Sequence, residues 1–224
     1  MSADLILVTG FEPYAGRGSN PAYEVMQALD GRTFEGKTVV GRSLPVSVTG
    51  MRNRLLPLLD EVKPAAVIGL GLWPGEPMIR LERVGINIAD FEIADNDGAV
   101  LRNATIAENQ PAARWSTLPL RAIETELLKE GIPVRLSSTA GTYLCNACLY
   151  TLLEGLAARR AAIPAGFIHL PYMPEQVAIL LNDLQMAAVM ELHQRADVAS
   201  MELSRTLKAI EIAIATTIKV MDGA

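Results

Sequence analysis

Short apolar runs alternate along this chain with longer stretches whose apolar residues recur at helical spacing. The runs at residues 5–8, 65–70 and 166–170 consist mostly of aliphatic, aromatic and glycine residues, with little polar alternation. A strand that is apolar on both faces needs helices on both sides of its sheet, because neither face can be left to water. The pattern therefore predicts an α/β protein: a three-layer α/β/α sandwich with a mixed, mostly parallel central sheet.

The segments between these runs carry the signals of helices and further strands. Asn20 followed by Pro21 is typical of a helix start, with Asn as the N-cap and Pro at the first helical position. Hydrophobic periodicity predicts the remaining elements: helices at residues 21–30, 51–62, 118–130, 144–158 and through the C-terminal tail, and strands at 37–48 and 134–137.

Residues 78–98 alternate between apolar and polar side chains, most clearly at residues 83–88. A period of two is typical of strands with one covered and one solvated face. The segment ends in Asp95-Asn96-Asp97-Gly98, which has the composition of a turn. We therefore expect antiparallel strands here, closed by this turn.

Composition defines the general class of protein. Of 224 residues, 20 are Lys or Arg and 25 are Asp or Glu, which leaves a net charge of −5, and half of the residues are hydrophobic. A chain of this length and balance is typical of a soluble globular protein, and we expect a single domain over residues 1–224. Because the chain is net acidic, it offers no electrostatic attraction to nucleic acid, and we expect none as a partner.

We expect no contact with a membrane either. The longest apolar-leaning stretch, near residues 210–220, is interrupted by Glu211 and Lys219 and is shorter than the roughly 18 apolar residues that a membrane span needs. The first residues lack the basic region and the long apolar core of a signal peptide. Two cysteines in a chain of this length favour a reduced, cytoplasmic location.

The two cysteines, Cys145 and Cys148, have different surroundings. Cys145 follows a turn of small residues and begins a predicted helix, where unpaired backbone N–H groups and the helix dipole favour the nucleophilic thiolate. Cys148 aligns with Leu152 and Leu156 on one side of that helix, as a core residue does. A redox C-x-x-C pair is the alternative, although pairs of the thioredoxin type open the first helix of a βαβ unit.

The chain also has only two histidines, His169 and His193. His169 ends the apolar run at 166–170, and sites in open α/β sheets form outside the carboxyl ends of strands. His193 lies among charged and polar residues, which indicates a solvated helix face. His169 is therefore the candidate partner for Cys145, with a purely structural strand-end histidine as the alternative. These residues lack any metal-ligand spacing, and we expect no zinc site among them.

Four blocks of residues resemble the pyroglutamyl peptidase I family of cysteine peptidases, also called pyrrolidone-carboxylate peptidases. They read TGFEPY at 9–14, ERVGIN at 82–87, AGTYLCN at 140–146 and GFIHLPY at 166–172. The resemblance implies a Cys-His-Glu triad on Cys145, His169 and Glu82. Nothing else in the sequence distinguishes Glu82 among the acidic residues, and an ordinary salt-bridged strand carboxylate is the alternative for it.

The resemblance also implies a substrate and a pocket. The substrate class is peptides with an N-terminal pyroglutamyl residue, a small neutral lactam, and the family works without a metal or cofactor. The pocket residues carried over by the resemblance are mostly apolar: Phe11, Tyr14, Ile93, Tyr143 and Leu144. The family further implies a homo-oligomer, often a tetramer.

Several positions depart from the family pattern. Tyr14 stands where a second Phe is usual, and Gly71-Leu72-Trp73-Pro74-Gly75 replaces a Gly-Gln-Ala-Gly-Gly turn. Glu92 aligns with a family arginine, and residues 176–200 look longer than the family average. These departures leave two alternatives open: a hydrolase of another small N-acyl or lactam substrate with the same triad, or a catalytically silent binding homologue.

Overall fold

The computed structural model describes residues 4–14, 16–187 and 198–223, and its centre is a seven-stranded sheet. The sheet order is β2-β3-β1-β4-β9-β5-β8, and a separate two-stranded sheet pairs β6 with β7. The strands are β1 Leu5–Phe11, β2 Thr33–Phe34, β3 Lys37–Leu44, β4 Ala66–Leu72, β5 Ile79–Glu82, β6 Val84–Ile86, β7 Ala113–Trp115, β8 Val134–Ser137 and β9 Ala165–Leu170. The helices are α1 Pro21–Leu29, α2 Val48–Val62, α3 Leu120–Lys129, α4 Leu144–Ala158, α5 Pro174–Met186 and α6 Leu203–Met221.

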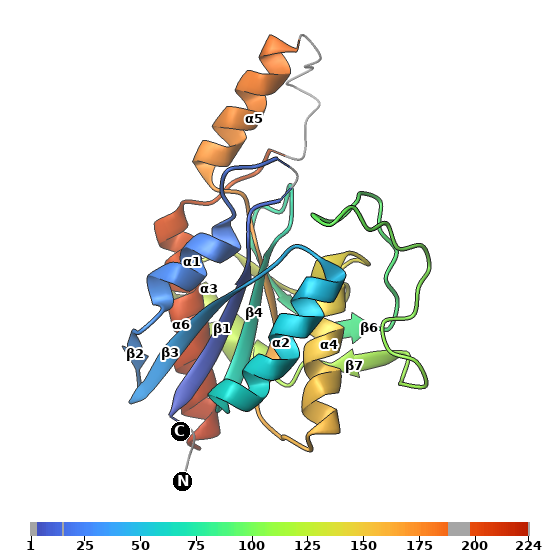
Figure 1. The fold of residues 1–224 in the computed structure, drawn as a ribbon. Coiled ribbons are helices and arrows are strands. Elements are labelled where there is room, and N and C mark those ends of the chain that lie inside the picture. Colours follow the sequence, from blue (N-terminus) through green and yellow to red (C-terminus); the bar gives the residue numbers. More distant parts are fainter. Residues whose placement is uncertain (1–3, 15, 188–197, 224) are drawn as a thin grey trace.

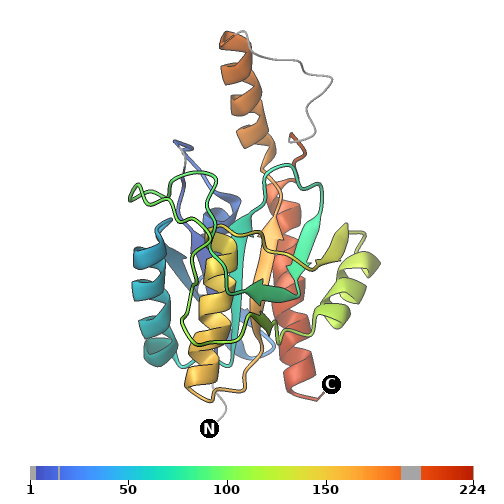
Figure 2. The same ribbon diagram turned by 90° about the vertical axis from the view of Figure 1, so that its right-hand side faces the viewer.

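Helices cover both faces of the sheet, as the apolar strands predicted (Figure 1, Figure 2). The core on one side packs α1, α3 and α6 against the strands, and the core on the other side packs α2 and α4. Strand β4 is buried along its whole length, because it lies in the middle of the sheet between these two layers. The predicted three-layer sandwich is therefore confirmed.

The sheet is mixed but mostly parallel, also as predicted. Strand β1 runs parallel to β3 and β4, and β4 runs parallel to β9. Strand β5 is antiparallel to β9 and parallel to β8. The carboxyl ends of β1, β4 and β9 consequently meet at one edge of the sheet, and this edge is where the α/β fold places its sites.

Residues 78–98 do form strands in antiparallel pairs, as predicted, but these strands do not pair with each other. Strand β5 joins the main sheet, whereas β6 pairs with the distant β7 through Val84–Trp115 and Ile86–Ala113. Asp95 does accept a turn hydrogen bond from the Gly98 N–H (3.0 Å), and the two sides of this turn meet in an isolated antiparallel bridge between Ala89 and Ala104, but they form no longer strands. The reason is that β5 is buried on both faces, so its partners are set by the sheet and not by the next segment of the chain.

Local capping explains where the helices begin. The Asn20 side chain accepts a hydrogen bond from the Ala22 N–H (3.0 Å), as the Asn-Pro signal predicted. Ser47 caps α2 in the same way through the Gly50 N–H (3.0 Å). Helix α4 differs, because Tyr143 stands at its N-cap and no side chain caps the helix. Its first N–H groups are therefore left available at the sheet edge.

Helix α5 stands away from the rest of the molecule (Figure 1, Figure 2). Val177 is buried near its base, but Ile179 is 62% exposed and Met186 is 80% exposed. In the described part of the chain, no helix is both long enough and apolar enough to span a membrane. The solvated helix face predicted for His193 lies outside the described residues.

Candidate active site

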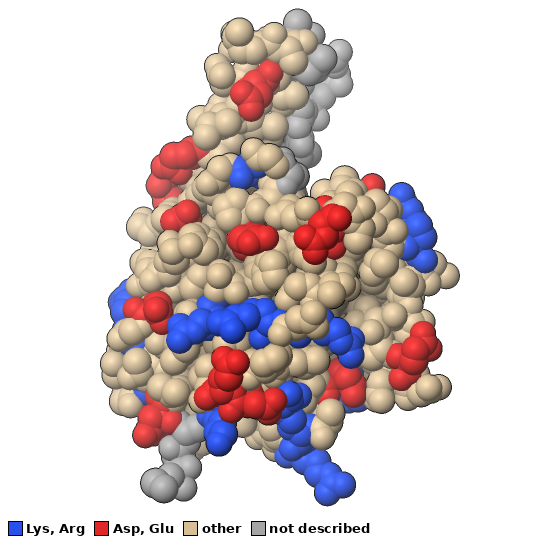
Figure 3. Space-filling view, in the orientation of Figure 1, with Lys and Arg blue, Asp and Glu red and all other residues tan. Residues whose placement is uncertain are grey.

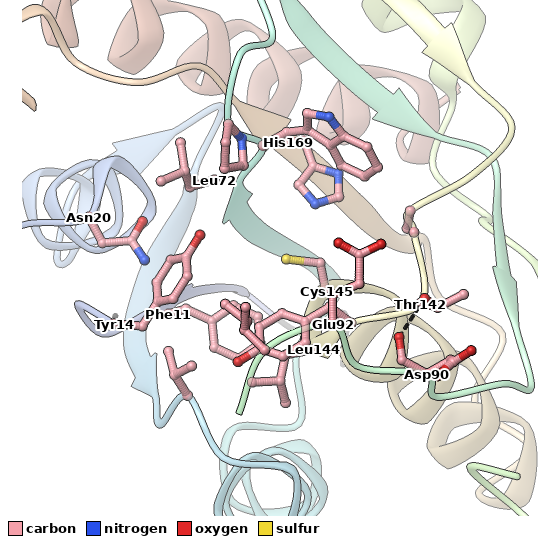
Figure 4. Close-up of a pocket in the computed structure, with 17 residues that line it drawn as sticks. Phe11, Tyr14, Asn20, Leu72, Asp90, Glu92, Thr142, Leu144, Cys145 and His169 are labelled. Carbon is pink, nitrogen blue, oxygen red and sulfur yellow. Dashed lines mark hydrogen bonds between the residues drawn. The ribbon is translucent and has the colours of Figure 1, made fainter. Parts of the chain in front are cut away.

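A cavity of about 370 Å³ opens at the carboxyl ends of β1, β4 and β9, beside the start of α4 (Figure 4). Two candidate catalytic side chains, Cys145 and His169, lie in its wall. The walls include Phe11, Tyr14, Asn20, Val46, Leu72, Trp73, Pro74, Asp90, Glu92, Ile93, Ala140, Gly141, Thr142, Tyr143 and Leu144. The fold thus brings together segments from most of the length of the chain.

Cys145 is the second residue of α4 and is half-buried. Its sulfur lies over Gly71 of β4, so closely that a Cβ atom built at Gly71 would come within 2.8 Å of Sγ. Gly71 is in turn the register partner of His169 on the neighbouring strand β9. The absence of a side chain at Gly71 therefore lets the sulfur approach the sheet beside His169, and Figure 4 shows the two side chains on the same side of the cavity.

His169 is held from behind by a carboxylate. Its Nδ1 lies 2.8 Å from Oε1 of Glu82, and both side chains are buried. The rings of Trp73 and Phe167 each approach the imidazole edgewise, with centroids 5.0 Å from its own. When Nδ1 carries the proton and donates it to Glu82, Nε2 is left as the proton acceptor. This arrangement of an oriented imidazole suits a general base.

Glu82 also accepts a hydrogen bond from a second side chain, the guanidinium of Arg80. Nε of Arg80 donates to the same oxygen, Oε1, at 3.0 Å. Burial alone would raise the pKa of Glu82, but the hydrogen bond with His169, followed by smaller contributions that include Ser137 and the charge of Arg80, outweighs it and lowers the pKa. Glu82 is therefore both a salt-bridged strand carboxylate and the partner of His169.

The resting protonation state of the Cys–His pair follows from its burial. Burial raises the pKa of the Cys145 thiol above its ordinary value, and the charges of Cys148 and Glu82 act in the same direction. Burial lowers the pKa of His169, against the opposing hydrogen bond from Glu82. Both directions favour a neutral thiol beside a neutral imidazole. The thiolate expected from the helix start is therefore not the favoured resting form.

The start of α4 offers hydrogen-bond donors next to the sulfur. Ala147 is the first residue of the helix whose N–H bonds a backbone carbonyl, that of Tyr143 (3.1 Å). Within the described ranges, the N–H groups of Leu144 and Cys145 have no acceptor. Unpaired N–H groups at a helix start attract negative charge, so this position suits the oxygen of a carbonyl under attack.

All five residues expected in the pocket line the cavity: Phe11, Tyr14, Ile93, Tyr143 and Leu144. The ring of Tyr143 packs edgewise on Phe91 (4.6 Å between centroids), and its hydroxyl donates to the Ala94 carbonyl (3.1 Å). The hydroxyl group of Tyr14 is kept protonated, because burial raises its pKa. The site therefore offers a mostly apolar surface with few polar groups.

Sequence reasoning did not assign a role to Asn146, which ties the cavity walls together. Its side chain donates to the carbonyls of Ile86 and Ile88 (2.9 Å each) and accepts from the Ile86 N–H (2.9 Å). These bonds fix the segment leading to Glu92 and Ile93 against α4. The presence of Asn146 in a family block was the only sequence signal for this contact.

Glu12 likewise holds the loop that carries Tyr14. Its Oε1 accepts from the Val46 N–H (3.0 Å) and from the side chain of Asn96 (3.2 Å), and its carbonyl accepts from Asn20 (3.0 Å). Among the residues with described positions, no three His, Cys, Asp or Glu side chains gather as metal ligands. Cys145 and Cys148 are both free thiols, with Cys148 packed in the core beside Leu149 and Leu152.

The comparisons with known proteins agree with this geometry. Residues 4–220 match the family model described as Pyroglutamyl peptidase. The chain belongs to this family. Pyrrolidone-carboxylate peptidases from Brevibacillus brevis and Bacillus cereus are 39% and 38% identical to it, over 97% and 95% of this chain and 97% and 92% of their own length.

Solved structures of the pyroglutamyl peptidase family share the fold. The pyrrolidone carboxyl peptidase from Thermococcus litoralis matches with a TM-score of 0.89 at 37% identity, covering 98% of this chain and 96% of that chain. A mutant of the pyrrolidone carboxyl peptidase from the hyperthermophile Pyrococcus furiosus matches with a TM-score of 0.89 at 34% identity, covering 97% and 99%. The whole architecture, and not only the site, is therefore that of the family.

The departures from the family pattern lie in the cavity wall. Leu72, Trp73 and Glu92 all line the cavity. In the part of the chain that the structure covers, Glu92 has no ion-pair partner: Arg80 is bonded to other carboxylates, and the guanidinium of Arg83 donates to the Ser138 hydroxyl (3.5 Å). Among the described residues, the Glu92 carboxylate therefore borders the mostly apolar pocket without a neutralising cation.

Proposed function

We propose that this protein is a cysteine exopeptidase that hydrolyses the amide bond after an N-terminal pyroglutamyl residue. The observation that carries the proposal is the hydrogen bond of 2.8 Å between Glu82 and His169, with His169 and Cys145 lining the same cavity. An imidazole oriented by a carboxylate next to a thiol at a helix start is the arrangement of nucleophilic catalysis. Membership of the family supports the same reaction.

In this mechanism the first half-reaction forms an acyl-enzyme. Nε2 of His169 takes the thiol proton as Sγ of Cys145 attacks the pyroglutamyl carbonyl carbon, and an S–C bond forms. The carbonyl oxygen becomes an oxyanion that accepts hydrogen bonds from the free N–H groups at the start of α4. His169 then gives its proton to the leaving amine, the C–N bond breaks and the shortened peptide departs.

The second half-reaction returns the enzyme. A water molecule attacks the thioester carbon while His169 takes one of its protons. The C–S bond breaks, the sulfur recovers its proton from His169, and pyroglutamate leaves with the second oxygen from water. Glu82 remains ionised throughout and stabilises each transient imidazolium, as the third member of such a triad does.

The pocket suits the pyroglutamyl group because that group is small, flat and neutral. Its lactam lacks a free α-amine, so it can be buried without leaving an unpaired charge. The rings of Phe11, Tyr14 and Tyr143 supply apolar surface around the cavity, which is lined as ligand pockets usually are. We propose these residues, with Ile93 and Leu144, as the substrate-binding wall.

The test compares pyroglutamyl and alanyl fluorogenic amides side by side, with the parent enzyme and with Cys145→Ser. Cleavage of the pyroglutamyl amide alone, lost in Cys145→Ser and kept in the matched variant Cys148→Ser, supports the proposal. Cleavage by Cys145→Ser would refute the assignment of the nucleophile. No cleavage by the folded parent enzyme would favour the silent binding homologue.

Glu92 favours a second candidate, a hydrolase of another small N-acyl or lactam substrate that carries a cationic group. The side chain lines the cavity and has no ion pair in the described part of the chain. The alternative is that the charge of Glu92 disfavours the oxyanion. In that case Glu92→Arg should raise kcat on pyroglutamyl amides, with less change in KM. The gain is limited to about three- to tenfold because solvent screens an exposed carboxylate. Faster cleavage of cationic lactam amides than of pyroglutamyl amides by the parent, with this preference lost in Glu92→Arg, would support the second candidate.

We also propose that the protein is a cytoplasmic homo-oligomer, as its family resemblance implies. Helix α5 projects from the body and carries only two charged residues, Glu175 and Asp183, and its face in Figure 3 is mostly uncharged. A second copy of the chain would cover Ile179 and Met186. Size-exclusion chromatography with light scattering tests this: Ile179→Glu should dissociate the assembly and Gln185→Glu should not, whereas a monomeric parent would refute it.

A further inference from the structure

Arg80 is buried behind the residues that line the cavity and does not line the cavity itself. Only 5% of its surface is exposed, and its guanidinium makes four side-chain or backbone hydrogen bonds in addition to the aromatic contact described below. It lies on β5 two residues before Glu82, so the two side chains share one face of the sheet. The register of the sheet places Arg80 directly opposite His169 on β9.

The guanidinium has a single orientation because its donors are all directed to different acceptors. Nε donates to Oε1 of Glu82 (3.0 Å) and Nη1 to Oε2 of Glu76 (3.1 Å). Nη2 donates to Oγ of Ser137 (2.7 Å) and to the carbonyl of Thr139 (2.7 Å). Lysine has no planar fork and could not make this set of bonds.

Trp73 connects the same guanidinium to the imidazole by a second route. The Cζ atom of Arg80 lies 3.7 Å from the centroid of the Trp73 ring, which is a close cation–π contact. Trp73 also contacts His169: the planes of the two rings are at 82° and their centroids are 5.0 Å apart. Arg80 therefore touches two of the groups that surround the imidazole, Glu82 through a hydrogen bond and Trp73 through its face.

The charges around the imidazole balance only when Arg80 is counted. Glu82 and Glu76 carry two negative charges, and Arg80 and Arg135 carry two positive ones, with Arg135 bonded to Glu76 from the half-exposed side. Cys145 faces the imidazole from α4 as a neutral thiol. The cluster is thus neutral when His169 is neutral, which is the form that accepts the thiol proton.

We propose that Arg80 is a positioning residue of the triad, which holds Glu82 and Trp73 in the arrangement that aims His169 at Cys145. This inference rests on the proposed function. Arg80 touches neither the cavity nor the reacting atoms and acts entirely through its neighbours. Because Oε1 of Glu82 is shared between Arg80 and His169, loss of the guanidinium frees the carboxylate to rotate and with it the imidazole.

The test uses three variants: Arg80→Met, which removes charge and fork; Arg80→Lys, which keeps the charge alone; and Arg135→Met as the matched control. Arg135 also binds Glu76 but contacts neither Glu82 nor His169 in the described structure. We expect kcat to fall about 10- to 100-fold in both Arg80 variants, with KM changed by less than about threefold, since a displacement of about 1 Å at a catalytic group has effects of this size. Arg135→Met should stay within about threefold of the parent.

The pH profile separates positioning from a purely structural role. The charge of Arg80 lowers the pKa of His169 and that of Glu82. In Arg80→Met the acid limb of kcat/KM should therefore move to higher pH, whereas Arg80→Lys should keep the limb and lose only kcat. If Arg80→Met does not fold, Arg80→Lys decides the question. Either of two results would overturn the proposal. One is a kcat of Arg80→Lys equal to that of the parent. The other is a folded Arg80→Met whose acid limb of kcat/KM lies at the same pH as that of Arg135→Met.

A readout without substrate distinguishes this proposal from the proposed function. The rate of Cys145 alkylation by iodoacetamide also depends on His169 as the base, and Cys145→Ser gives the background. If the parent does not cleave pyroglutamyl amides, the proposed function fails, but a shifted pH dependence of alkylation in Arg80→Met still supports the role of Arg80. If the parent cleaves them and neither profile moves, only the role of Arg80 is refuted.

Discussion

Gly71→Ala tests the placement of the nucleophile with the addition of a single methyl group. The new Cβ would come within 2.8 Å of Sγ of Cys145 and within 2.8 Å of two ring atoms of Phe167. The buried Phe167 ring is overpacked in this variant, and the half-buried sulfur, which borders the cavity, is the neighbour that has space to move away from the new methyl group. Carbon and sulfur atoms need roughly 1 Å more than this distance, and a displacement of about 1 Å at a reacting atom lowers the rate by about 100-fold.

Gly69→Ala is the matched control for this change. Gly69 lies two residues earlier on β4, and a Cβ there would come within 2.6 Å of the Phe167 ring but would not meet Cys145. Both variants overpack the same ring, at a cost of about 1–3 kcal/mol of unfolding free energy. For a chain of this length each kcal/mol lowers Tm by about 2–4 °C.

The assay measures kcat on a pyroglutamyl amide, the rate of Cys145 alkylation and Tm for the two variants and the parent. We expect both variants to lose thermal stability, and only Gly71→Ala to lose about 100-fold in kcat, which is about 2.7 kcal/mol of transition-state stabilisation. Parental kcat and parental alkylation in a folded Gly71→Ala would show that the sulfur is not held over Gly71. Equal losses of kcat in both variants would trace the effect to Phe167 instead.

Other predictions concern the triad and its pH dependence. Iodoacetamide should label Cys145 before Cys148, because Cys148 is only 1% exposed, and equal labelling in the native protein would contradict this. His169→Ala should lower kcat as much as Cys145→Ala, and Glu82→Gln should cost less because the imidazole keeps a hydrogen-bond partner; the reverse order would exclude Glu82 as the orienting group. Since burial lowers the pKa of His169, the acid limb of kcat/KM should lie below the ordinary histidine value of about 6.5. The unfolded chain binds the proton more readily than the folded one, so the free energy of unfolding should fall as the pH drops below about 6.5, and urea titrations across this range would check it.

The layered fold could be predicted from the sequence because its signals are local. Apolar runs define the buried strands, and Asn20 and the stripe of α4 mark helices at the positions where the structure has them. The pairing of β6 with β7 was missed because the partner residues are separated by about 30 positions in the chain and neither strand is longer than three residues. No periodic signal is available in strands of that length.

The candidate site was only partly predictable. The chain has only two cysteines and two histidines for Cys–His chemistry, and the position of His169 at the end of a predicted strand made it the candidate. Glu82 came from the family resemblance alone, because a carboxylate on a buried strand has no sequence feature that marks its partner. No sequence feature marked Arg80 as part of the site, since its partners lie on β5, on β8 and in the loop before β5.

The direction of β5 explains why Arg80 and Glu82 have different roles although they are two residues apart on one face. With β5 antiparallel to β9, Leu81 lies opposite Ile168, Arg80 lies opposite His169 and Glu82 lies opposite Phe167. Directly opposed side chains, such as Arg80 and His169, have Cβ atoms about 5 Å apart, and diagonal ones, such as Glu82 and His169, about 7–8 Å. Glu82 therefore reaches Nδ1 with an extended side chain, while Arg80 passes behind the imidazole. If β5 were parallel to β9 and Leu81 still lay opposite Ile168, Glu82 would lie opposite His169 and Arg80 opposite Phe167. Arg80 would then lie next to an aromatic ring and away from the contact between Glu82 and the imidazole. The antiparallel junction of β5 and β9 therefore puts Arg80 behind the carboxylate of Glu82, where its charge adds to the effect of the hydrogen bond with His169 in keeping Glu82 ionised.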